Sequence, residues 1–298
     1  MLSVGRILEG AFGLVRERYV AVAVWIGLYL AVNIAFMLTI MPMMGATMNP
    51  AAATDPGAML GAMLPMFALI PVFFVVAVVL YAAAMRAVLR PDAGGIAYLR
   101  LGMDELRLIG LSIIFAIAGT ILMFVISLAL GLVGVGIAAS GEPGVGSVLF
   151  SFLFMIGIFA VMIFFVVRFS LAFPLTLYRG KIVIGEAWTL SSGRFWSLFG
   201  AALGITLIMM ILNIAVSMFT MGSYFYDLMS AAGDPEAVAL AAEAQAQSYA
   251  QFSPVMILSS LGTAIVAGLG VALTGGSVAT AAKLLLADED EDAEDVFG

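Results

Sequence analysis

Few side chains in this sequence are suited to chemical catalysis. The chain contains no His and no Cys, so it lacks the commonest general base and metal ligand and has no thiolate nucleophile. The carboxylates of Asp104, Glu105 and Glu186 are the remaining candidates for a general base or a metal ligand. Because adjacent residues on a helix point in different directions, Asp104 and Glu105 do not form a converging pair. We therefore predict no catalytic, cofactor-binding or metal-binding site.

Arg168 is the strongest candidate for a charged residue with a functional role. It directly follows the apolar residues 148–167, and ionisable side chains within a membrane are costly and usually functional. There it could bind an anionic substrate, with Glu186 as the nearest prospective carboxylate partner. Alternatively, about 20 apolar residues already cover the hydrocarbon core. The Arg168 guanidinium would then lie at the membrane edge and extend to lipid phosphates.

The elements that position these residues are predicted to be membrane-spanning helices. Hydrophobic residues make up 64% of the chain and charged residues 10%, whereas soluble domains have about 25% charged residues. The predicted fold is an all-α membrane protein with six transmembrane helices, because six apolar stretches are long enough to cross the hydrocarbon core. These stretches are residues 19–44, 59–81, 108–139, 148–167, 196–221 and 254–273.

The positive charges predict how the helices are threaded. All 12 Lys and Arg residues lie before the first stretch, between the second and third, between the fourth and fifth, or after the sixth. The three other loops, 45–57, 140–147 and 222–253, contain neither residue type. Since Lys and Arg accumulate in cytoplasmic loops, both termini are predicted to be cytoplasmic.

Three cytoplasmic segments, each leading into an odd-numbered span, resemble one another. Each runs from a Gly close to an Ile to an Arg at the start of the span, and its apolar residues recur at helical spacing. Amphipathic interfacial helices are therefore predicted over 3–17, 95–107 and 181–194. Residues 1–287 can then be interpreted as three repeats of an interfacial helix and a two-span hairpin. The alternative is that any such hairpin begins with an Arg-flanked amphipathic turn. The acidic residues 288–298 are predicted to be a disordered, solvated tail.

Two shorter patterns predict local helix structure. The sequence Asp234-Pro235-Glu236 is typical of an N-cap followed by the first turn of a helix, here through about Gln251. Small residues recur at every fourth position in the fifth and sixth spans, which favours close helix packing within one chain over dimerisation. They are Gly200 and Gly204 in the fifth span, and Ala264, Gly268, Ala272 and Gly276 in the sixth.

Residues 168–196 resemble the segment that follows the fourth span in bacterial six-span membrane proteins of the YciC type. Similar sequences form the membrane domain associated with glycerophosphodiester phosphodiesterases. The resemblance implies a multi-pass protein of the bacterial inner membrane. It does not imply phosphodiesterase activity, because the acid/base chemistry of those enzymes depends on His, which this chain lacks. The residues that carry the resemblance or adjoin it are Arg168, Pro174, Gly185, Glu186, Ala187, Trp188, Leu190, Ser191, Gly193, Arg194, Phe195 and Trp196.

Three functions from different classes remain open. The favoured one is a non-enzymatic component that organises the membrane or envelope, in contact with the lipid bilayer and with a membrane-protein partner or a second copy. It needs no cofactor and no nucleic acid. The second is a transporter or permeation protein for small apolar or anionic substrates, in which Arg168 binds the anion. The third is an interfacial lipid-modifying enzyme using the carboxylates named above. The transporter would have few polar lining residues: Asn33, Ser112, Thr120, Ser127 and Asn213.

The predicted topology can be tested with reporter fusions. Fusions within 45–57, 140–147 and 222–253 should report the outer side of the membrane, because these loops lack Lys and Arg. Fusions within 90–107 should report the cytoplasm. A cytoplasmic signal from any of the three outer loops would contradict the six-span threading.

Overall fold

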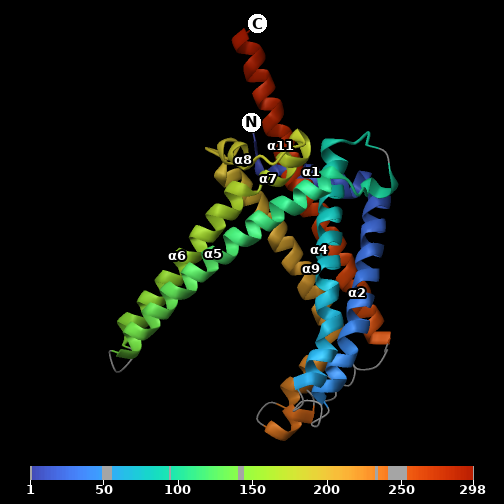
Figure 1. Cartoon of the computed structure of the whole chain (residues 1–298), viewed down its shortest axis with the longest axis vertical. Helices are drawn as coiled ribbons and strands as arrows, with labels where there is room; N and C mark the ends of the chain where they lie inside the picture. Colours follow the sequence, from blue (N-terminus) through green and yellow to red (C-terminus); the bar gives the residue numbers. More distant parts are fainter. Residues whose placement is uncertain are drawn as a thin grey trace. The chain divides into compact units, whose positions relative to one another are not determined.

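The computed structural model describes residues 2–48, 56–93, 95–139, 144–231, 234–240 and 254–297. Within these ranges the chain is helical and has no β-strand, and six helices are long and apolar enough to cross a membrane. The predicted fold class, an all-α chain with six candidate transmembrane helices, is confirmed (Figure 1). The six helices are α2 (Tyr19–Met48), α4 (Pro56–Leu89), α5 (Met103–Ala139), α6 (Val145–Phe169), α9 (Phe195–Ser230) and α11 (Pro254–Phe297).

Every long helix contains one predicted apolar stretch and most extend beyond it. Shorter elements precede α2 or lie between α4 and α5 and between α6 and α9. They are α1 (Val4–Glu17), the 3₁₀ turn η1 (Ile96–Tyr98), α7 (Ala172–Arg179) and α8 (Ile184–Leu190).

The segment 95–107, predicted as one interfacial helix, is not helical throughout. Ala97 and Tyr98 have left-handed backbone conformations, with φ of 53° and 60°, which a right-handed α-helix excludes. Leu99 is extended, and α5 begins only at Met103. The prediction failed because this backbone is held by tertiary contacts, described below, that the local pattern does not reveal.

The other two segments predicted to be interfacial helices do contain helices. Residues 3–17 correspond to α1, whereas in 181–194 only residues 184–190 form α8. Gly180 (φ 63°) is the left-handed C-cap that ends α7, and Gly193 (φ 74°) is left-handed in the turn between α8 and α9. The predicted disordered tail 288–298 is instead helical to Phe297, as a continuation of α11. The threefold repeat and the interfacial position of these segments stay predictions.

The predicted N-cap at Asp234 is confirmed. Its carboxylate Oδ1 accepts hydrogen bonds from the backbone N–H groups of Glu236, at 3.0 Å, and Ala237, at 3.3 Å. Residues 235–240 are helical. The rest of that predicted helix, 241–251, lies outside the described residues.

The chain divides into two compact units, and helices α1, α9 and α11 contribute to both. The first unit consists of Met1–Ile7, Leu101–Ala202 and Val278–Gly298, and the second of Leu8–Arg100 and Leu203–Ser277. Within the first, α5 and α6 run side by side (Figure 1). A buried cluster lies where α6, α7 and α8 meet the end of α11, and it includes Leu171, Leu175, Ala187 and Leu285.

In the second unit, α2 and α4 run side by side (Figure 1) and pack with α11 through small residues. A Cβ atom at Gly268 would lie only 2.5 Å from Ile26 Cγ1 and 3.1 Å from its Cα, and one at Gly275 would lie 2.7 Å from Ala84 Cβ. Ala264 and Ala272 are fully buried. The small-residue ridge of the last span therefore serves close packing within the chain, as predicted.

Gly268→Ala should destabilise the protein, because the added methyl group meets the α2 backbone and not a flexible side-chain end. Overpacking of this kind costs about 1–3 kcal/mol, measurable as lower resistance to SDS-induced unfolding in detergent micelles. Gly27→Ala is the matched control on α2, since its Cβ would meet nothing within 4 Å. A Gly268→Ala variant as stable as the parent would contradict the close approach.

Candidate functional site

The six residues singled out from the sequence all lie in the first unit, in the connection from α6 through α7 and α8 to α9. The structure brings two of them into direct contact, Arg168 and Trp188. The other four occupy separate places in the same connection: Pro174, Glu186, Arg194 and Trp196.

Arg168 lies in the last turn of α6, and its guanidinium is held against α8. Its Cζ is 4.3 Å from the centroid of the Trp188 ring and 5.8 Å from that of Phe164, within the range of a cation–π interaction. Its Nη1 donates a hydrogen bond to Ser191 Oγ at 3.3 Å. The Trp188 ring and the Ser191 hydroxyl therefore fix the charged end of α6 to the end of α8.

Ser191 completes this arrangement, which we call the Arg168 clamp (Arg168, Trp188 and Ser191). The Ser191 side chain is fully buried. Its hydroxyl lies within donating distance of the main-chain oxygens of Arg168, at 3.0 Å, and Trp188, at 3.1 Å. A buried hydroxyl that both donates and accepts is satisfied. The clamp thus joins two helix ends through one side chain.

The Trp188 ring is itself surrounded by aromatic side chains of α6. Ring centroids lie 5.3 Å away at Phe169, 5.9 Å at Phe164 and 6.3 Å at Phe165, distances typical of favourable aromatic pairs. The Nε atom of Arg168 is buried and has no hydrogen-bond partner among the described residues. One face of the guanidinium is thus closed by aromatic carbon, and one of its N–H groups remains unsatisfied.

Glu186, expected as the nearest carboxylate partner of Arg168, pairs with Arg179 instead. Its Oε1 is 2.7 Å from Arg179 Nη2 and 2.8 Å from Arg179 Nε. The left-handed turn at Gly180 folds α8 back toward the end of α7, which brings these two residues together. Both side chains are about one third exposed, so the pair adds at most about 1 kcal/mol to stability.

The other candidates have structural environments. Pro174 is buried in the first turn of α7, where its missing N–H would have no helical acceptor. Arg194 Nη2 is 3.9 Å from Asp288 Oδ2, a long ion pair. The Trp196 side chain is 77% exposed and makes edge-to-face ring contacts with Phe195 and Phe199, a position typical of interfacial tryptophans.

The carboxylates considered for catalysis also hold local structure. Glu105 is almost fully buried, and its Oε2 accepts a hydrogen bond from the backbone N–H of Gly102 at 3.0 Å. This is the arrangement in which the third residue of a helix caps its own N-terminus. Asp104 Oδ1 pairs with Arg107 Nη1 at 3.1 Å. Among the described residues, no three Asp or Glu side chains converge as a metal site would require.

Most polar residues proposed to line a transport path bond to their own helix. The hydroxyls of Ser112 and Thr120 each donate to the carbonyl four residues earlier, at 2.8 Å, and Asn213 Nδ2 donates to Met209 O at 2.9 Å. Asn33 lies on α2, and Ser127 is exposed on α5. Back-bonding of this kind satisfies a polar side chain in an apolar helix without any ligand.

Sequence reasoning missed a second clamp, in the second unit, formed by Trp25, Arg86 and the turn η1. Trp25 Nε1 donates to Ala97 O at 3.0 Å, and Arg86 Nη1 donates to Tyr98 O at 2.6 Å. Trp25 is fully buried and Arg86 is 2% exposed. A left-handed non-glycine residue costs about 1–2 kcal/mol, so bonds from two buried donors hold the strained turn. Trp25 could have indicated this clamp from the sequence, because an indole N–H in an apolar span needs a hydrogen-bond acceptor.

Comparison with known proteins leaves the family open. No family model, curated protein or solved structure matches the chain. The resemblance to six-span membrane proteins of the YciC type stays a prediction.

The Arg168 clamp predicts a measurable coupling between Arg168 and Trp188. Arg168→Gln should cost about 1–2 kcal/mol through the lost charged hydrogen bond and cation–π contact. A double-mutant cycle with Trp188→Leu should give a coupling energy of about 0.5–2 kcal/mol. The control cycle, Arg179→Gln with Glu186→Gln, should give less than about 1 kcal/mol because that pair is partly exposed. Additive costs at Arg168 and Trp188 in SDS unfolding would refute the clamp.

Proposed function

We propose that this protein is a non-enzymatic, multi-pass component of the bacterial inner membrane that associates with lipid at its cytoplasmic face. In this proposal both termini are cytoplasmic, and the chain is a relative of the six-span proteins of the YciC type. The observation that carries the proposal is the use of the charged and polar groups. The charged side chains considered for chemistry or transport instead hold helix ends and turns together. The polar side chains within the spans bond to their own helices.

The Arg168 clamp supports this function over transport. A substrate-binding arginine must present its N–H groups to the substrate, as in two-pronged recognition of a carboxylate or phosphate. The Arg168 guanidinium instead lies 4.3 Å from the Trp188 ring centroid and donates to Ser191. Its contacts resemble those of a residue that fixes the end of a transmembrane helix.

The distribution of charge supports an action at the membrane surface. The Lys and Arg residues occur only in the segments predicted to be cytoplasmic, where basic residues attract lipid head groups. Exposed apolar side chains cover the long helices, for example Phe124 at 70% and Leu153 at 64% exposure on α5 and α6. Such surfaces suit contact with lipid chains.

One observation favours transport of an anion as the second candidate. The Nε atom of Arg168 is buried and has no hydrogen-bond partner among the described residues. A bound anion would satisfy it, and hydrogen bonds to charged groups contribute about 1.5–3 kcal/mol. Lipid phosphate or water at the end of α6 would satisfy it equally.

Flux measurements separate the two candidates. The purified protein, reconstituted into liposomes loaded with radiolabelled phosphate and acetate, should release them no faster than protein-free liposomes. Lipid should remain bound to the protein through detergent exchange, as measured by mass spectrometry of the intact complex. Protein-dependent anion flux that Arg168→Gln abolishes and Arg179→Gln leaves unchanged would overturn the proposal in favour of transport.

A further inference from the structure

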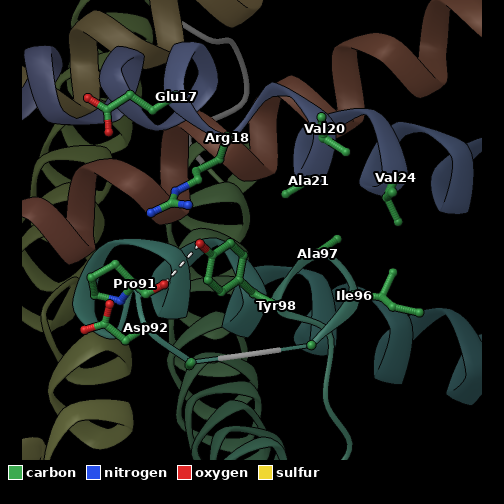
Figure 2. Close-up of a pocket in the computed structure, with 12 residues that line it drawn as sticks. Glu17, Arg18, Val20, Ala21, Val24, Pro91, Asp92, Ile96, Ala97 and Tyr98 are labelled. Atoms are coloured by element: carbon green, nitrogen blue, oxygen red, sulfur yellow. Dashed lines mark hydrogen bonds between the residues drawn. The ribbon is translucent and has the colours of Figure 1, made fainter.

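A groove of 560 Å³ in the second unit lies between the α1–α2 junction and the loop that leads from α4 to η1. Its lining residues come from the end of α1, the first turns of α2, residues 91–93 and residues 95–98. Figure 2 shows the two helices on one side of the groove and the loop on the other. All of its walls therefore belong to one compact unit.

Charged residues line one half of the groove. Arg18 lies between Glu17 and Asp92 in Figure 2, and its guanidinium points toward the loop. The Arg18 Cζ is 5.6 Å from the centroid of the Tyr98 ring, and the Tyr98 hydroxyl donates to Pro91 O at 3.3 Å. The Tyr98 ring thus contacts the flat face of the Arg18 guanidinium. The N–H groups at the edge of the guanidinium remain available for hydrogen bonds.

The charges of this half are not consumed within the protein. Among the described residues, neither Glu17 nor Asp92 forms an ion pair, and Arg18 forms none either. All three side chains are exposed. One cation and two anions are therefore free to bind a ligand that itself carries one negative and one positive group.

The other half of the groove is apolar and leads along α2. Val20 and Val24, one helical turn apart, share a face of the helix, and Ile96 of η1 lies across from them in Figure 2. Val20 is 60% and Ile96 is 79% exposed. Because α2 is a candidate membrane span from Tyr19, this half continues from the end of the span toward its apolar middle.

We propose that this groove binds a phospholipid whose head group carries a primary ammonium, such as phosphatidylethanolamine. The Arg18 guanidinium binds the phosphate, the ammonium donates to the carboxylate of Glu17 or of Asp92 on either side of it, and the acyl chains lie along Val20, Val24 and Ile96. This inference rests on the proposed lipid-associated function and names its ligand class.

The charges of the groove discriminate against other common lipids. A quaternary choline group has no N–H to donate to the carboxylates, so phosphatidylcholine offers Glu17 and Asp92 a positive charge but no hydrogen bond. Phosphatidylglycerol brings a negative phosphate and no cation to a groove with two carboxylates and one guanidinium. Selectivity arises from groups that the wrong lipid leaves unpaired.

The test is lipid binding to the full-length protein in detergent, measured by native mass spectrometry with three lipids of identical acyl chains. Phosphatidylethanolamine should bind about tenfold more tightly than phosphatidylcholine or phosphatidylglycerol, a difference that one charged contact supplies. The double variant Glu17→Gln/Asp92→Asn should lose this preference. Arg18→Gln should weaken phosphatidylethanolamine and phosphatidylcholine alike. Arg16→Gln, an exposed cation of α1 outside the groove, should change neither.

Three results would overturn the inference. The parent protein could bind the three lipids equally, the preference could survive in the carboxylate double variant, or Arg16→Gln could match Arg18→Gln. In the same assay, soluble phosphoethanolamine should not displace the lipid at millimolar concentration, because the apolar half contributes to binding. Its displacement of the lipid would also overturn a lipid site. If the protein bound the three lipids equally and caused no anion flux, selective lipid binding in the groove would be refuted. The proposed function would then still stand.

Discussion

The structure depends on one constraint: a polar group in hydrocarbon must find its partner within the protein. The long helices satisfy their backbone internally, and Ser112, Thr120 and Asn213 bond to carbonyls of their own helices. The six predicted apolar stretches contain no Asp, Glu, Lys or Arg, so these side chains lie beyond the ends of the stretches. The non-helical connections between spans must therefore be held by side chains from those ends.

Two clamps meet this need in a similar way, although they lie in different units. The last turns of α4 and α6 each carry an arginine that donates to the connection following it, Arg86 to Tyr98 O and Arg168 to Ser191 Oγ. A tryptophan accompanies each arginine. Trp25 donates to the same turn as Arg86, whereas Trp188 supplies a ring face to Arg168. Eight of the 12 Lys and Arg residues lie in the segments 86–107 and 168–194, to which the two arginines belong.

The features that could be predicted from the sequence depend on local or one-dimensional physics. Hydropathy located the six long helices, and the N-cap at Asp234 follows from the chemistry of neighbouring residues. The turn at Ala97 and Tyr98 could not be predicted, because its left-handed backbone is held by residues far away in the chain. The pairing of Glu186 with Arg179, in place of Arg168, likewise depends on the direction of the turn at Gly180. The groove that contains Arg18 is formed by the α1–α2 junction and the loop from α4 to η1, which only the fold brings together.

The central claim is that the charged side chains at the helix ends hold the protein together and bind lipid, and do not serve a substrate path. An experimental structure in lipid nanodiscs tests it most directly. It should show the Arg168 guanidinium stacked on Trp188, apolar side chains filling the space between the spans, and lipid density beside Arg18. A continuous water-filled cavity reaching Arg168, with the guanidinium turned away from Trp188 and toward a bound anion, would contradict it.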